Sequence, residues 1–422
     1  MINPGSFAVV LFLAAPVSAA DFQERHFSRG WAQVQAAAPD PLPARSALAP
    51  GQRQAPDLHN PVAHMDITGK AFEVYAARFG GGELARYIGA VEDSKPSPET
   101  PDTVIAGAFD EDKSYKNPFG ELIPVLRHFW DSTGGPYKGY QGNDSSVNRA
   151  QKYWTGGFGL DGKFDKTWKG KGDGALALYR KGEKGRAYWY LGHIAHLVED
   201  ITVPPHAHLY THVGEGSDAY ETYMKHHFGD WRPQPGAQAI EDFASLYELF
   251  EKTAAITNGY DAGSGPGDKG RDGQIDKGNR RAGGFSDAEL IEEGNVLMPL
   301  AYNRVAALFV YFYKQIDHAA PRVTLARPRS EASACLLQAS ASDEVSGVDK
   351  AGYVFEYRTL DGRSWSAWQP VGPQGGAAAS LLGKPGVLYS IRVSAVDAAG
   401  NRARSAPWLW RAPASSGRLA AL

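Results

Sequence analysis

The sequence has almost no cysteine: of its 422 residues, only Cys335 carries a thiol. A single thiol cannot form an internal disulfide, so the fold cannot depend on one. Cys335 lies in EASACLLQASAS, where apolar and polar residues alternate as in a strand, and we expect it to be a buried structural residue. The fold must therefore be held by side-chain packing and, we expect, by bound metal.

An excess of charge of either sign is also missing. The formal net charge is −3, so the composition gives no sign of nucleic acid as a partner, which would favour a basic face. Hydrophobic residues make up 43% and charged residues 22% of the chain, a globular composition that excludes wholesale disorder. A chain of this length is expected to form two or three domains, each with its own core.

Long apolar runs are lacking too. The run FAVVLFLAAPV at residues 7–17 is too short to span a bilayer, and small residues at 18–20 follow it as at a cleavage site. Although no Lys or Arg precedes this run, we interpret residues 1–20 as a signal peptide and expect a secreted or periplasmic protein. Residues 21–62 are rich in proline and alanine without periodicity, which indicates a linker or pro-segment.

Two hydrophobic patterns divide the rest of the chain. Residues 63–318 show helical periodicity, most clearly at 286–317, where Ser286 and Glu289 form a capping box before a broad apolar stripe. Residues 320–412 form short alternating segments with regular turn signals, which predict an antiparallel sandwich resembling immunoglobulin or fibronectin type III modules. The predicted fold class is a mainly α-helical bundle followed by a β-sandwich. The Gly- and Asp-rich segment 258–285 is predicted to be a surface loop.

The segment AYWYLGHIAHLVEDITVPPHAH, residues 187–208, carries the strongest chemical signal. His196 and Asp200 are four residues apart in a predicted helix, so their side chains lie on one face. Pro204 and Pro205 break this helix, and His206 follows. Imidazole nitrogens and carboxylate oxygens are ligands that Zn²⁺ prefers, so this segment can supply half of a divalent metal site.

Other helical segments contain the remaining candidate metal ligands. His64, Asp110, His128 and Glu221 are ligand types spread over the helical region, and His193, on the same helix as His196, is expected to be a core or supporting residue. Together they predict a metal centre built from several distant segments.

The order and spacing of these residues resemble the zinc-dependent phospholipase C family, the bacterial phospholipases that include clostridial α-toxin. The resemblance covers roughly residues 62 to 316 and is strongest at four motifs. They are His64 with Ile67 and Thr68, the run Phe109-Asp110-Glu111-Asp112, the run His128-Phe129-Trp130-Asp131, and Tyr190-Leu191-Gly192 with His196, Asp200 and His206.

This resemblance implies two or three Zn²⁺ ions at one end of a helical bundle, a fold that S1/P1 nucleases share. It implies one ion held by Asp110, His128, His196 and Asp200. A second would take His206 and Glu221 with one more ligand, and a third His64, a bridging Asp200 and the mature N-terminal residue. It also makes Asp110 the candidate catalytic base.

Two positions depart from the family pattern. The family places a His four residues before the residue that matches Glu221, where this chain has Ser217, and Asp218 and His212 are the candidate replacements. The family also has a Trp shortly before its first His, whereas the nearest upstream here is Trp31, separated from His64 by the Pro-rich segment.

The resemblance implies a secreted zinc phosphodiesterase of the phospholipase C type, which hydrolyses glycerophospholipid to diacylglycerol and a phosphorylated head group. Phospholipid or a membrane surface would be its partner, and the sandwich a module for membrane, cell wall or glycan. The alternatives are a single-strand nuclease of the S1/P1 type, disfavoured because its Asn-Leu-His motif is absent, and a non-catalytic surface protein stabilised by zinc.

Overall fold

The computed structural model divides the chain into two units, Met1–Gln52 and Arg53–Leu422, and all of the described residues belong to the second. The predicted signal peptide and the Pro/Ala-rich segment, apart from Val62, lie outside the described residues. The structure describes residues 62–89, 102–113, 128–132, 145–156, 173–208, 219–233, 239–260, 266–269, 275–277, 286–331 and 333–414.

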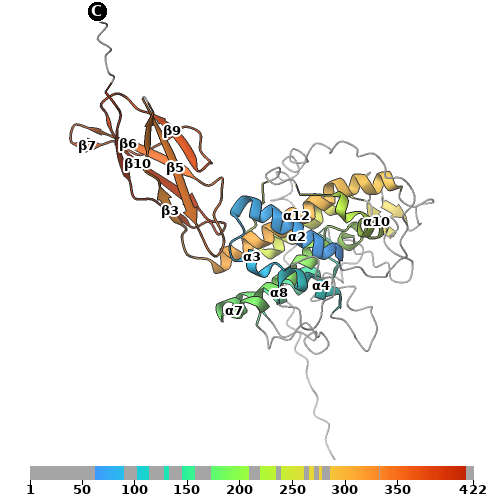
Figure 1. The fold of residues 1–422 in the computed structure, drawn as a ribbon. Helices are drawn as coiled ribbons and strands as arrows, with labels where there is room; N and C mark the ends of the chain where they lie inside the picture. Colours follow the sequence, from blue (N-terminus) through green and yellow to red (C-terminus); the bar gives the residue numbers. More distant parts are fainter. Residues whose placement is uncertain are drawn as a thin grey trace, which may run out of the picture. The chain divides into compact units, whose positions relative to one another are not determined.

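The first part of the second unit is helical, as predicted (Figure 1). Its helices are α2 (Val62–Phe79), α3 (Leu84–Tyr87), α4 (Val104–Lys113), α6 (Ser146–Thr155), α7 (Ala175–Arg180), α8 (Lys184–Asp200), α9 (Pro204–Ala207), α10 (Ala219–His227), α11 (Leu246–Thr257) and α12 (Asp287–Ile316), with a 3₁₀ turn at Phe228–Asp230.

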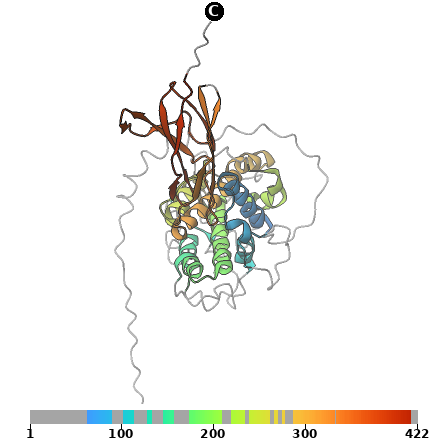
Figure 2. The ribbon, with the colours of Figure 1, turned by 60° about the vertical axis from the view of Figure 1, so that its left-hand side comes forward.

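Helix α8 lies at the centre of this helical part. It packs against α2, α4, α6, α7 and α12, and Figure 2 shows the packed helices from a second side. Every residue from Ala187 to Asp200 is buried. A helix that is apolar or aromatic on all sides is a core helix, so its few polar residues are enclosed with it. These enclosed residues include His193, His196, Glu199 and Asp200.

Two glycines allow α4 and α8 to approach closely. A Cβ atom on Gly192 of α8 would lie 2.0 Å from the carbonyl oxygen of Val104, and one on Gly107 of α4 would lie 1.9 Å from that of Trp189. No side chain fits at either position, because both contacts are with backbone. This close contact places α4 directly beside the face of α8 that carries His196.

Helix α12 begins at the predicted capping box: the Ser286 hydroxyl accepts from the Glu289 N–H, and the Glu289 carboxylate accepts from the Ser286 N–H. Among the described helices it is the one long and apolar enough to cross a membrane, but 72% of its most apolar 18-residue window is buried inside the protein. We therefore interpret α12 as a core helix, packed on α2 and α8.

The C-terminal part is the predicted β-sandwich. One sheet has the order β11-β10-β6-β7, with β12 beside β10 and β8 beside β6; the other has the order β3-β5-β4, with β9 beside β5. The strands are β3 (Arg322–Leu325), β4 (Arg329–Glu331), β5 (Ala334–Ser342), β6 (Val354–Asp361), β7 (Ser364–Trp365), β8 (Gln369–Pro370), β9 (Ala378–Leu382), β10 (Leu388–Val396), β11 (Arg402–Arg404) and β12 (Trp408–Arg411).

Residues of both sheets share one core. Cys335 and Leu337 of β5 pack with Phe355 of β6 and with Ile391 and Val393 of β10. The buried Cys335 confirms the prediction made from its alternating segment. Burial raises the pKa of its thiol to about 11, which makes it unreactive near neutral pH.

One segment differs from its prediction. Within 258–285, expected to be loop throughout, β1 (Pro266–Lys269) pairs antiparallel with β2 (Ile275–Lys277). Glycine and aspartate disfavour strands, so composition gave no indication of this pairing. The pairing rests on backbone hydrogen bonds, which do not need an apolar pattern.

Candidate metal centre

Asp200, the last residue of α8, is the point on which the predicted ligands converge. It is 2% exposed, and four imidazoles lie around its carboxylate. The Oδ1 atom is 3.7 Å from His64 Nε2 and 3.8 Å from His206 Nδ1. The Oδ2 atom is 2.6 Å from His128 Nδ1 and 3.3 Å from His196 Nε2. Segments far apart in the sequence thus meet at one carboxylate.

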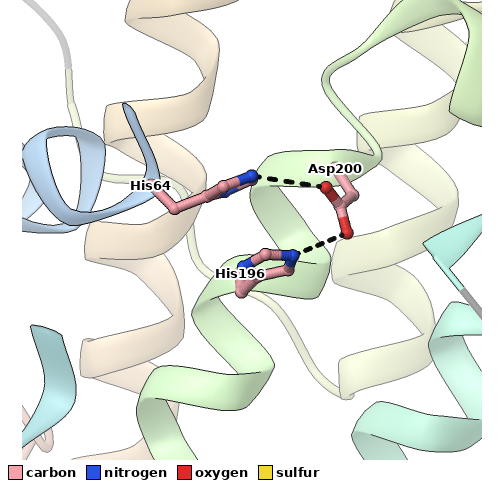
Figure 3. A group of neighbouring side chains, drawn as sticks. All are labelled: His64, His196 and Asp200. Atoms are coloured by element: carbon pink, nitrogen blue, oxygen red, sulfur yellow. Dashed lines mark ion pairs between the residues drawn. The ribbon is translucent and has the colours of Figure 1, made fainter. Parts of the chain in front are cut away.

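Three of these residues form a compact donor group. One ligand atom from each of His64, His196 and Asp200 lies within 4.8 Å of the other two, close enough to contact a common ion. Figure 3 shows His64 and His196 on the same side of the Asp200 carboxylate, with both rings directed at it. The two rings are stacked, with their centroids 3.8 Å apart.

In His196 and His64, a hydrogen bond on the side of the ring away from Asp200 determines which nitrogen is available to bind a metal. His196 Nδ1 donates to the carbonyl oxygen of Ala108, at 2.7 Å, because a carbonyl can only accept. In a neutral ring Nε2 then carries the lone pair, and in His196 this atom faces Asp200. His64 Nδ1 lies 2.7 Å from the buried Glu199 carboxylate, which also accepts from the Thr68 hydroxyl. Such partners orient histidine ligands in metal sites.

His206 extends the centre to α10. It follows Pro204 and Pro205 in the short helix α9, and its Nδ1 donates to the carbonyl oxygen of His128 at 3.2 Å. Its Nε2 lies 3.0 Å from Glu221 Oε1, which pairs the two residues expected to share a second ion. The ring of Phe129 stacks on His206 with centroids 4.3 Å apart and keeps its orientation.

The electrostatics of Asp200 also favour a cation. Burial would raise the pKa of its carboxyl, but the charges and hydrogen bonds of His196 and His128 outweigh that effect and hold the pKa well below its usual range. Asp200 is therefore an anion, and a carboxylate together with neutral imidazoles is a donor combination that divalent metals bind.

Asp110 is placed differently from the other predicted ligands. Its Oδ2 accepts from the indole Nε1 of Trp189 at 3.0 Å. Among the described residues it forms no hydrogen bond or ion pair with the four histidines, Asp200 or Glu221. Its assignment as ligand and base stays a prediction.

Glu111, the neighbour of Asp110, has a role that the sequence did not indicate. It is 1% exposed and contacts the Arg149 guanidinium, the Tyr153 hydroxyl at 2.7 Å, and His193 Nδ1. Burial raises the pKa of the Glu111 carboxyl, but Arg149 and His193 outweigh it and hold the pKa well below its usual range. His193 is thus a core residue that supports this network, as expected.

Some predicted residues lie outside the described part of the chain. They are Trp31, His212, Ser217, Asp218 and the side chain of Asp112. Glu199, by contrast, is a described contact of the site that sequence reasoning did not identify, and its hydrogen bond with Thr68 of the His64 motif was not anticipated. The available signal was a glutamate enclosed in an otherwise apolar helix, one residue before Asp200, and a Thr one helical turn after His64.

Solved structures similar to this chain include two clostridial toxins. The alpha toxin from Clostridium absonum is 13% identical with a TM-score of 0.38, and the match covers 83% of this chain and 97% of that one. The Clostridium perfringens alpha-toxin isolated from avian strain SWCP is 12% identical with a TM-score of 0.34, and the shares covered are the same. No protein-family model and no curated protein matches the sequence. The chemistry of the site is therefore inferred from its own residues.

Proposed function

We propose that the chain is a secreted or periplasmic, zinc-dependent phosphodiesterase of the phospholipase C type. It hydrolyses glycerophospholipid to diacylglycerol and a phosphorylated head group. The observation that carries the proposal is the convergence of His64, His128, His196 and His206 on Asp200. The motif resemblance described above supplies the reaction.

The donor set fits zinc better than other common divalent cations. Neutral imidazole nitrogens and carboxylates suit Zn²⁺, whereas Ca²⁺ and Mg²⁺ take oxygen ligands almost exclusively. The two oxygens of Asp200 face different imidazole nitrogens, Oδ1 toward His64 Nε2 and Oδ2 toward His196 Nε2, while His206 Nε2 faces Glu221. A carboxylate placed in this way suits a bridge between ions, so we propose two or three Zn²⁺ rather than one.

Bound zinc would activate water for attack on a phosphodiester and neutralise charge on the phosphate oxygens. The protein's own residues hold the donors in position for this chemistry. Ala108 and Glu199 fix the rings of His196 and His64, and the His128 carbonyl fixes that of His206. Such preorganisation matters because a misplacement of about 1 Å can lower a rate by roughly 10²-fold.

Asp110 is the proposed base. The indole of Trp189 engages its Oδ2, which restricts rotation of the carboxylate and leaves Oδ1 as the atom that could accept a proton from water. Asp110→Asn should therefore lower kcat by about 10² or more while the protein stays folded, since base catalysis typically contributes that much.

The sandwich is the proposed module for surface contact. Of the tryptophans that could mediate it, Trp410 is 7% exposed, and its indole donates to Ser330 Oγ, so it belongs to the core. Trp408 is 41% exposed and sits beside Leu409 on β12. An exposed tryptophan of this kind suits insertion into a lipid interface.

Activity on two substrates tests the reaction. The zinc-loaded chain should hydrolyse a chromogenic phosphocholine ester, and His196→Ala should abolish this activity. Hydrolysis of single-stranded DNA in preference to the ester would favour the nuclease alternative. Stable, zinc-loaded protein that turns over neither substrate would favour the non-catalytic alternative and overturn the proposal.

A further inference from the structure

Three aspartates outside the histidine centre come together at one end of the β-sandwich. Asp317 follows the last residue of α12, Asp343 follows β5, and Asp397 follows β10. One carboxylate oxygen from each lies within 4.8 Å of the other two. All three belong to the second compact unit of the chain.

This cluster concentrates negative charge in a buried place. Asp317 is 4% and Asp397 2% exposed. Within the part of the chain that the structure describes, no Lys, Arg or His forms an ion pair with any of the three. Like charges at this distance are costly in a buried site unless a cation compensates them.

A buried carboxylate oxygen without a hydrogen-bond partner is a second indication of a bound cation, independent of the charge. Asp317 Oδ1 accepts from the backbone N–H of Ala319 at 3.1 Å. Its Oδ2 is buried and has no hydrogen-bond partner among the described residues. Leaving such an acceptor unsatisfied costs about 1–3 kcal/mol or more, so natural structures seldom do so without a ligand.

The other two carboxylates are held in fixed positions. Asp343 Oδ1 accepts from the backbone N–H groups of Val345 and Ser346, at 2.9 and 2.8 Å. Asp397 accepts from the backbone N–H and the side-chain amide of Asn401, at 2.8 and 3.0 Å. The same Asn401 amide donates to the carbonyl oxygen of Asp317 at 3.1 Å. The donor group is thus assembled before any ion binds.

We propose that Asp317, Asp343 and Asp397 form a structural calcium site, separate from the histidine centre. Carboxylate oxygens on loops are the ligands of Ca²⁺, which takes 6–8 oxygens in flexible geometry. Mg²⁺ demands a near-ideal octahedron, and Zn²⁺ favours imidazole or thiolate, neither of which the three residues supply. Backbone carbonyls and water would complete the coordination.

Calcium at this site would stabilise the fold. The loop that holds Asp343 continues to Val348, whose N–H donates to the Phe79 carbonyl at 2.9 Å, while the N–H of Glu83 donates to the carbonyl of Val345 at 2.8 Å. An ion that holds Asp317 against Asp343 and Asp397 would therefore also stabilise these backbone contacts with the end of α2 and the residue before α3.

Calcium titration of the full chain tests the proposal. Isothermal titration with CaCl₂ should show one site per chain, and differential scanning calorimetry should show a higher Tm in calcium than in calcium-free buffer. Asp317→Asn should abolish both effects. It should also raise the Tm in calcium-free buffer, because it removes one of three repelling charges while it keeps the acceptor for Ala319.

Asp361 provides a matched control. It is an exposed aspartate at the end of β6 in the same sandwich. The Asp361→Asn variant should bind calcium as the wild type does, and calcium should raise its Tm by the same amount. If the wild-type chain neither binds Ca²⁺ nor gains stability from it, the site does not exist. Equal calcium binding by wild type and by Asp317→Asn would likewise overturn the proposal.

Discussion

At the scale of residues, burial distinguishes the chain's histidines. His196 is enclosed with its Nδ1 held by a backbone carbonyl, and His206 is 6% exposed with a similar partner. His227 is more exposed, and its Nδ1 pairs with Asp230 three residues on. An enclosed imidazole with one nitrogen committed and the other facing a carboxylate suits metal ligation, whereas an exposed local pair does not.

Glu111 gives a prediction at this scale. Glu111→Gln should lower the free energy of unfolding by about 3 kcal/mol near neutral pH, because it leaves the charge of Arg149 buried without its partner. The folded-state pKa of Glu111 is lowered, so its contribution is full above the unfolded value of about 4.3 and is lost as the pH falls below it.

Urea denaturation of both proteins from neutral pH to well below the unfolded pKa of about 4.3 measures this effect. The difference in the free energy of unfolding between the wild type and Glu111→Gln should shrink as the pH falls. The exposed Glu183 provides the control, since Glu183→Gln should change stability by less than about 0.5 kcal/mol. A pH-independent gap between wild type and Glu111→Gln would contradict the assignment.

At the scale of elements, the contact between α4 and α8 determines where the candidate metal ligands lie. It brings Ala108 against His196 and Asp110 against Trp189. Both contacts depend on Gly107 and Gly192, where backbone meets backbone. The position of the histidines is therefore determined by helix packing rather than by a loop.

Gly192→Ala tests this dependence. The added methyl group would meet the Val104 carbonyl, so we expect a loss of at least about 2 kcal/mol in unfolding free energy, together with weaker zinc retention. Gly229→Ala is the matched control, because nothing lies within 4 Å of the atom it adds. Thermal unfolding and zinc content compare the two, and an undisturbed Gly192→Ala protein would refute close packing at this contact.

The sequence predicted the helices and strands whose patterns are strong. The capping box of Ser286 and Glu289 begins α12, and the alternating segment around Cys335 forms β5. Glu199, Glu111 and the three clustered aspartates could not be recognised, because their meaning depends on partners such as Thr68 or Asn401 that lie far away or in loops. Local pattern predicts elements, whereas contacts between distant segments decide which polar residues act together.

At the scale of the whole molecule, the helical part and the sandwich have separate cores. The aromatic residues around α8 form one, and the residues around Cys335 form the other. Because Cys335 is the chain's single cysteine, its thiol reports on the sandwich alone.

A thiol reagent should therefore detect opening of the sandwich. In the native chain at neutral pH, Cys335 should react at least about 10²-fold more slowly than a free thiol, because burial raises its pKa to about 11. Denaturant should restore one reactive thiol per chain. Rapid reaction of the native protein with Ellman's reagent would show that the sandwich core is open to solvent.

The central claim is that several histidines share Asp200 as an anchor for more than one zinc ion. Elemental analysis of the purified full chain tests it most directly, with Asp200→Asn measured beside the wild type. We expect two or three zinc ions per wild-type chain and a loss of at least one in Asp200→Asn. One zinc or none in the wild type, or an unchanged content in the variant, would contradict the account.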